Sequence, residues 1–115
     1  MADRTIRDFT SVASGVTANK DSAIIPNGKK IVITKVGASD INLGDNKSSI
    51  FQLQFGTPGG AFTNIFAFAL TGSTYEFESK ELIVGDGVKV IRLLRTNTSL
   101  LGAKNLAMWI KGYDV

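Results

Sequence analysis

The chain has 115 residues, of which 43% are hydrophobic and 20% are charged, and its formal net charge is +3. This length predicts one domain, which would bury roughly two-thirds of the surface that the unfolded chain exposes. Cysteine and histidine are absent, which excludes disulfides and thiolate sites and removes the commonest general base and transition-metal ligand.

The distribution of charged and apolar residues excludes further classes of function. Basic residues are spread along the chain and Lys29-Lys30 is the only adjacent basic pair, whereas nucleic-acid binders concentrate Lys and Arg on one surface. No apolar run approaches the roughly 18 residues that a membrane-spanning helix needs. The first fifteen residues mix acids and bases, so we expect no secretory signal. These features predict a protein that binds neither nucleic acid nor membrane.

The first part of the chain predicts an arm followed by short strands. Residues 1–8 are polar without a clean period, and we expect a flexible N-terminal arm before a single β-sandwich domain at residues 9–115. Residues 9–17 favour a strand, and residues 19–22 favour a turn. Pro26-Asn27-Gly28 is a strong turn tripeptide before a β-branched strand at residues 29–38.

The middle of the chain predicts a hairpin. Five of the seven phenylalanines lie in residues 49–70, where two alternating segments flank a turn at residues 57–60. Alternation predicts Phe51, Leu53 and Phe55 on one face of the first strand. In the second strand it groups the even-numbered residues of 62–70 on one face and the odd-numbered residues on the other.

The rest of the chain continues the strand pattern. Tyr75 and Phe77 alternate with Glu76 and Glu78, which predicts a strand with one solvated face. Further strands are expected at residues 82–84 and 88–95, followed by a loop at residues 97–102. Residues 104–115 fit either a strand or a helix, and we interpret them as a strand.

About eight short strands separated by turns, with no substantial helix, predict an all-β protein. The expected architecture is an antiparallel β-sandwich, jelly-roll-like. Because residues 49–70 are apolar on both faces, with Ile50, Ile65, Ala67 and Ala69 opposite the phenylalanine row, a second copy or another subunit should cover the surplus face.

Three groups of residues could carry chemistry, and each has a plainer interpretation. Glu76, Glu78 and Glu81 could supply a carboxylate pair but suit a solvated strand face. The loop at residues 40–46 resembles a calcium loop but lacks its terminal Glu. Trp109, Tyr113 and Tyr75 could stack on a sugar, although packing is the commoner role. We therefore predict a non-enzymatic protein with no catalytic, cofactor-binding or metal-binding residue.

The order of turns and strands resembles that of small β-sandwich proteins from tailed-phage virions. The segments that carry the resemblance are SAIIPNGKKIVITKVGAS, LQFGTPGG, LIVGDGVKVIRL and MWIKGYDV. The resemblance implies a virion component made in the host cytoplasm, either a capsid decoration (cement) protein or a jelly-roll domain at a tail tip or fibre. Such proteins are commonly homodimers or homotrimers that bind a major capsid or tail protein.

The predicted function is therefore stabilisation of a phage head through protein–protein contacts. The candidate contact residues are Ile6, Phe9, Leu100, Leu101 and Trp109. The alternative is a module that binds a carbohydrate or receptor at a tail tip or fibre. The oligomer order, the head or tail location and the partner's identity stay open.

Overall fold

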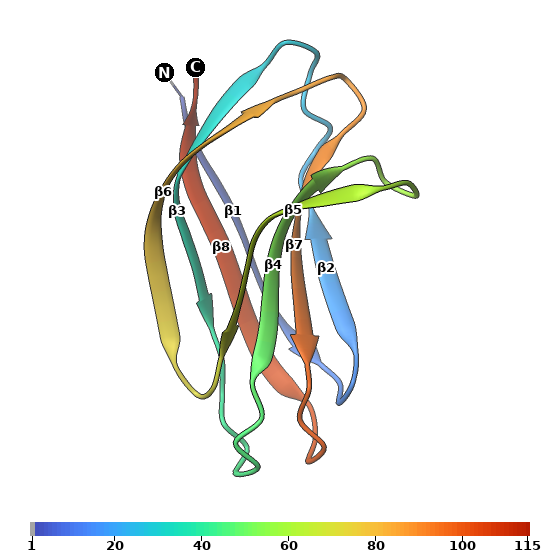
Figure 1. Ribbon diagram of the computed structural model, residues 1–115, viewed down its shortest axis with the longest axis vertical. Coiled ribbons are helices and arrows are strands. Elements are labelled where there is room, and N and C mark those ends of the chain that lie inside the picture. Colours follow the sequence, from blue (N-terminus) through green and yellow to red (C-terminus); the bar gives the residue numbers. More distant parts are fainter. Residues whose placement is uncertain (1) are drawn as a thin grey trace.

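The computed structural model describes residues 2–115, which contain eight β-strands (Figure 1). Met1 lies outside the described residues. The strands are β1 (Asp3–Val12), β2 (Thr17–Asp21), β3 (Lys30–Ser39), β4 (Ser49–Gly56), β5 (Phe62–Leu70), β6 (Thr74–Val84), β7 (Val90–Asn97) and β8 (Lys104–Asp114).

The strands form two four-stranded sheets in the orders β1-β8-β3-β6 and β2-β7-β4-β5. All neighbouring strands are antiparallel, and apart from the β4–β5 hairpin no two neighbouring strands are consecutive in the sequence. This is the strand order of a jelly roll, in which a double Greek key wraps one sheet over the other. The predicted all-β, jelly-roll-like sandwich is confirmed. Among residues 2–115 there is no helix that could cross a membrane.

The core lies between the two sheets and is built from alternate residues of the central strands. Phe51 and Leu53 of β4 are fully buried, as are Leu106 and Met108 of β8. Period-two alternation places such residues on one face of each strand, and each fully buried aliphatic or aromatic side chain stabilises the fold by about 1.5–3 kcal/mol. The strand interpretation of residues 104–115 is confirmed by this inward row, and the helix alternative is wrong.

The predicted N-terminal arm is wrong for the residues that the structure describes. Residues 3–12 form β1, which pairs with β8 over its whole length, from Asp3 opposite Tyr113 to Val12 opposite Lys104. The inward row of β1 contains Arg4 and Asp8, which break the apolar alternation. Arg4 forms an ion pair with Asp114 of β8, and Asp8 forms one with Arg95 of β7. This polar segment can therefore pair as a strand of the sheet. Residues 19–21, predicted as part of a turn, belong to β2.

A β-bulge changes which side chains of β5 face the core. The register with β4 shifts between Leu53 and Gln54, and such a shift reverses the side-chain alternation beyond it. Phe66 and Phe68 pack against the core as predicted. Phe62 instead packs against the guanidinium of Arg92, whose Cζ lies 3.9 Å from the centroid of the Phe62 ring. The predicted common face for all even-numbered residues of 62–70 is therefore wrong.

Candidate functional site

The outer face of the sheet β1-β8-β3-β6 carries a row of residues centred on Trp109. Register places Arg7, Trp109, Gly37 and Glu76 side by side on the four strands. The indole lies against Gly37, where an added Cβ would come within 2.3 Å of the ring. Trp109 Nε1 donates a hydrogen bond of 2.7 Å to Glu76 Oε2. The glycine is thus the space into which the indole fits, and Glu76 fixes its orientation.

Basic side chains surround the Trp109–Glu76 pair. Lys35 Nζ lies 3.8 Å from Glu76 Oε1, and Lys111 Nζ lies 3.9 Å from Glu76 Oε2. The hydrogen bond from Trp109 holds the pKa of Glu76 below its ordinary value, and the two lysines add to this effect. A glycosidase general acid needs a raised pKa, so Glu76 is poorly suited to that role.

Two hollows open on the same face. One of about 150 Å³ is lined by Thr5, Arg7, Glu76, Trp109 and Lys111. The other, shallower and of about 690 Å³, includes Lys35, Glu78 and Tyr113 in its lining. Aromatic and charged groups therefore line a surface wide enough for a polar ligand, although Arg7 lies 5.8 Å from the centroid of the indole and partly covers it.

The β7–β8 loop presents two leucines to solvent. Leu100 is 81% exposed and Leu101 is 62% exposed. The loop lies with the β3–β4 loop at the end of the sandwich opposite the termini (Figure 1). Asp45 Oδ2 accepts hydrogen bonds from Ser99 Oγ at 2.7 Å and from the Leu100 backbone N–H at 3.1 Å. The leucines therefore sit on a loop that hydrogen bonds hold in place.

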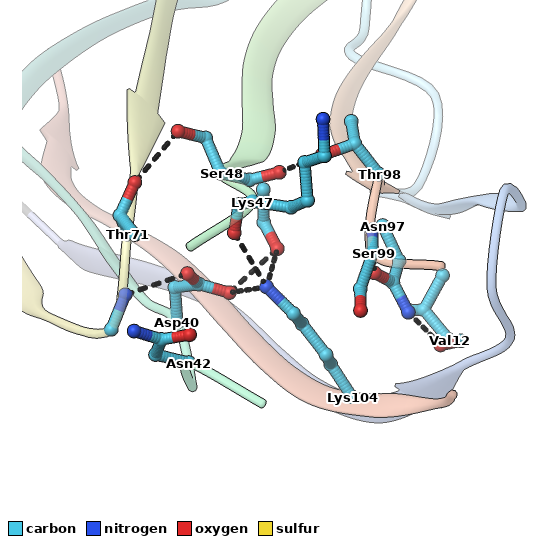
Figure 2. A network of polar contacts seen from close by, with 12 residues as sticks. Val12, Asp40, Asn42, Lys47, Ser48, Thr71, Asn97, Thr98, Ser99 and Lys104 are labelled. Carbon is cyan, nitrogen blue, oxygen red and sulfur yellow. Dashed lines mark hydrogen bonds and ion pairs between the residues drawn. The ribbon is translucent and has the colours of Figure 1, made fainter. Parts of the chain in front are cut away.

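A buried polar network supports this loop end (Figure 2). Lys104 Nζ lies 3.2 Å from Asp40 Oδ1, and both side chains are fully buried. The ammonium also donates to the Lys47 carbonyl at 3.0 Å, and Asp40 accepts from Ser49 Oγ at 2.6 Å and from the Gly72 N–H at 2.8 Å. A buried ion pair is tolerated when hydrogen bonds satisfy its remaining donors and acceptors, as here.

The same network accounts for the loop that resembled a calcium site. The carboxylate of Asp40 accepts hydrogen bonds from Lys104, Ser49 and Gly72. The carboxylate of Asp45 accepts hydrogen bonds from Ser99 and Leu100. Across residues 2–115, no group of three acidic side chains is placed to hold a metal ion. The Asp and Asn residues of the loop thus serve its conformation.

The five candidate contact residues do not form one surface. Ile6 is half-buried and packs against the core, whereas Phe9 is 66% exposed on the outer face of β1. Trp109 shares that outer face, and Leu100 and Leu101 lie on the loop end. Tyr75, which could have joined Trp109 in holding a sugar, packs instead against Phe68 and Phe77 on the interior side of the sheet.

The two long sides of the sandwich differ. We call the side formed by edge strands β1 and β2 the closed side, and the side formed by edge strands β5 and β6 the open side. On the closed side, Arg95 points inward and is fully buried, with Nη2 at 2.7 Å from Asp8 Oδ2. On the open side, a cluster of aromatic rings bridges the sheets, with centroids 5.2–6.3 Å apart: Phe66, Phe68, Tyr75 and Phe77.

Sequence reasoning missed the buried charges, although a signal was present. Lys104 has the same phase as Leu106 and Met108 in β8, and Arg95 has the same phase as Leu93 in β7. Strict alternation places residues of one phase on one face of a strand. Applied to charged residues as well as apolar ones, it would have predicted that both basic side chains point into the sandwich.

The chain matches no protein-family model and no curated protein. It resembles 18 solved chains. One is the crystal structure of PirA, with a TM-score of 0.51 and 13% identity over 93% of each chain. Another is the Yersinia pseudotuberculosis-derived mitogen, with a TM-score of 0.43 and 8% identity over 95% of this chain and 85% of the mitogen. At this identity, the likeness to PirA supports the fold alone.

Proposed function

We propose that this chain is a non-enzymatic structural protein that binds other protein subunits, as a decoration protein of a phage head does. The observation that carries the proposal is the pair Leu100 and Leu101, exposed by 81% and 62% on a hydrogen-bonded loop. Exposed apolar groups in fixed positions are typical of protein interaction sites. The turns that resemble those of phage virion proteins are what point to a virion.

The mechanism is burial of the loop end against a neighbouring subunit. Full burial of one leucine side chain stabilises a complex by about 1.5–3 kcal/mol, before the costs of association. Because Asp45 and Asn97 already hold the loop, with Asn97 Nδ2 donating to the carbonyls of Val12 and Gly102 at 2.9 Å, little conformational entropy is lost on binding. Two leucines on such a loop can therefore anchor the domain.

The test uses heads assembled from the purified major capsid proteins of tailed phages. We expect the wild-type protein to sediment with the heads and the double variant Leu100→Lys, Leu101→Lys to stay in solution. Val88→Lys is the matched control, because Val88 is 50% exposed and belongs to the connection between β6 and β7, which lies at the other end of the sandwich (Figure 1). Binding by the double variant, or no binding by the wild type, would contradict the proposal.

The second candidate function is carbohydrate binding on the outer face of β1-β8-β3-β6. Trp109 and Tyr113 favour it, because both lie beside hollows that charged side chains also line, and aromatic and polar groups together fit a sugar. A glycan array with wild type, Trp109→Ala and Tyr75→Ala discriminates. Selective binding that only Trp109→Ala removes would favour this function over decoration, whereas no binding by the wild type would dismiss it.

A further inference from the structure

The four edge strands of the sandwich differ in charge. An edge strand exposes backbone N–H and C=O groups that could pair with another strand, and proteins block this with charges, prolines or bulges. Three of the edges carry charged residues. These are Asp3, Arg4, Arg7 and Asp8 of β1, Lys20 and Asp21 of β2, and Glu76, Glu78, Lys80 and Glu81 of β6.

The fourth edge strand, β5, has neither a charged residue nor a proline in its nine residues, FTNIFAFAL. Its one protective feature is the bulge opposite Leu53 and Gln54. Beyond this bulge, the stretch from Phe66 to Leu70 pairs regularly with β4 on one side. In the part of the chain that the structure describes, no strand pairs with its other side.

The surface beside this edge is apolar. On the outer face, Ala67 and Ala69 are exposed next to Ile50, which is 39% exposed. On the inner side, Phe66 and Phe68 are only half-buried, and Tyr75 of the same aromatic cluster is 50% exposed. Open backbone groups flanked by uncovered apolar side chains specify an extended β-strand as the partner.

We propose that β5 pairs antiparallel with β5 of a second copy of this chain about a two-fold axis. The two sheets β2-β7-β4-β5 then join into one continuous sheet. In such an interface the same strand meets itself, so like charges would face each other across the axis. A strand without charges avoids that repulsion, whereas the three glutamates of β6 would suffer it.

The pairing also covers the open side of both copies. Each β5 supplies backbone partners to the other, and the half-buried Phe66 and Phe68 of one copy lie next to those of its partner. The small side chains of Ala67 and Ala69 allow close approach on the outer face. This inference goes beyond the proposed function, because the β5 edge is distinct from the leucine loop at the end of the sandwich.

The test is the mass of the full chain in solution, measured by light scattering on a sizing column. We expect the wild type at micromolar concentration to have twice the 12.3 kDa mass of one chain. Ala67→Lys should have the mass of one chain, because each copy then carries a charge in the uncharged stretch that pairs across the axis. Gln52→Lys is the matched control: it lies opposite Ala67 on β4, one strand away from the edge, and should stay dimeric.

A wild type that is a single chain, a trimer or a larger species would overturn the proposal, as would a dimer that persists in Ala67→Lys. Ala69→Lys is the second variant and carries the test if Ala67→Lys does not fold. A monomeric protein that still coats phage heads would refute the β5 pairing alone. A dimer that does not bind heads would refute the decoration function alone.

Discussion

The closed and open sides of the sandwich differ in the charges that their edge strands carry and in how far those edges are covered. On the closed side, β1 carries four charged residues, and two of them have partners within the chain: Arg4 pairs with Asp114 at 2.7 Å and Asp8 pairs with Arg95 at 2.7 Å. On the open side, β5 carries no charge, and the aromatic residues beside it are only half-buried.

This difference separates stability from assembly. Arg4, Asp8 and Asp21 of the closed side form ion pairs within one chain, so that side contributes to the stability of the single domain. The open edge has no strand partner among residues 2–115, and its apolar surface gains most from a second subunit. Substitutions on the closed side should therefore lower the free energy of unfolding of the single chain. Substitutions on the outer face of the open edge should instead weaken the association of two chains.

The largest expected effect is at Asp8. Its carboxylate is the only acidic partner of Arg95 within residues 2–115, and Arg95 Nε and Nη1 have no hydrogen-bond partner in that same range. Asp8→Ala leaves a buried, unpaired guanidinium, which should lower the free energy of unfolding by about 3–5 kcal/mol. Urea denaturation measures this, with Asp3→Ala, exposed on the same strand, as the control. Equal stability of the two variants would show that water reaches Arg95.

A smaller effect is expected at Phe68 on the open side. Its ring stacks on the fully buried Phe51 at 5.6 Å and meets Phe77 edge-on at 5.4 Å. Phe68→Ala should cost about 2 kcal/mol, less than a fully buried phenylalanine, because its side chain is half-buried. Thermal denaturation at a concentration that favours single chains measures this. Tyr75→Ala should cost less, and the reverse order would contradict the described packing.

The smallest effect is the pH dependence that Asp114 contributes. Its hydrogen bond from Arg4, aided by Lys29, lowers its pKa from the ordinary 3.8 to about 2. A group whose pKa is lower in the folded state stabilises the fold above the unfolded pKa. That contribution is lost as the pH falls from about 4 towards 2. Asp114→Asn should flatten the loss of stability in this range in urea titrations, and an unchanged slope would contradict the assignment.

Much of the fold could be predicted because its strands follow a simple period. Alternation in residues 49–55 placed Phe51 and Leu53 in the core, and turn residues such as Pro26-Asn27-Gly28 marked strand boundaries. The predicted outward positions of Ala67 and Ala69 are also confirmed, since both are exposed. Ile65 instead packs against the core, because it lies at the β5 bulge, which period-two reasoning does not anticipate.

The candidate sites were harder to predict because they depend on partners far apart in the sequence. Asp40 and Lys104 are 64 positions apart, and Trp109 and Glu76 are 33 apart. No local pattern pairs such residues. The neutral composition of β5 is visible in the sequence, but its meaning depends on its being an edge strand, which only the sheet order reveals.

The most direct test of the claim that the open side joins subunits is hydrogen exchange of the backbone amides at low and high protein concentration. If β5 pairs with a second copy, protection of the Phe66–Leu70 amides should rise with concentration, while the amides of the edge strands β1, β2 and β6 should not change. Protection of β5 that is independent of concentration, or a rise in another edge strand instead, would contradict the account.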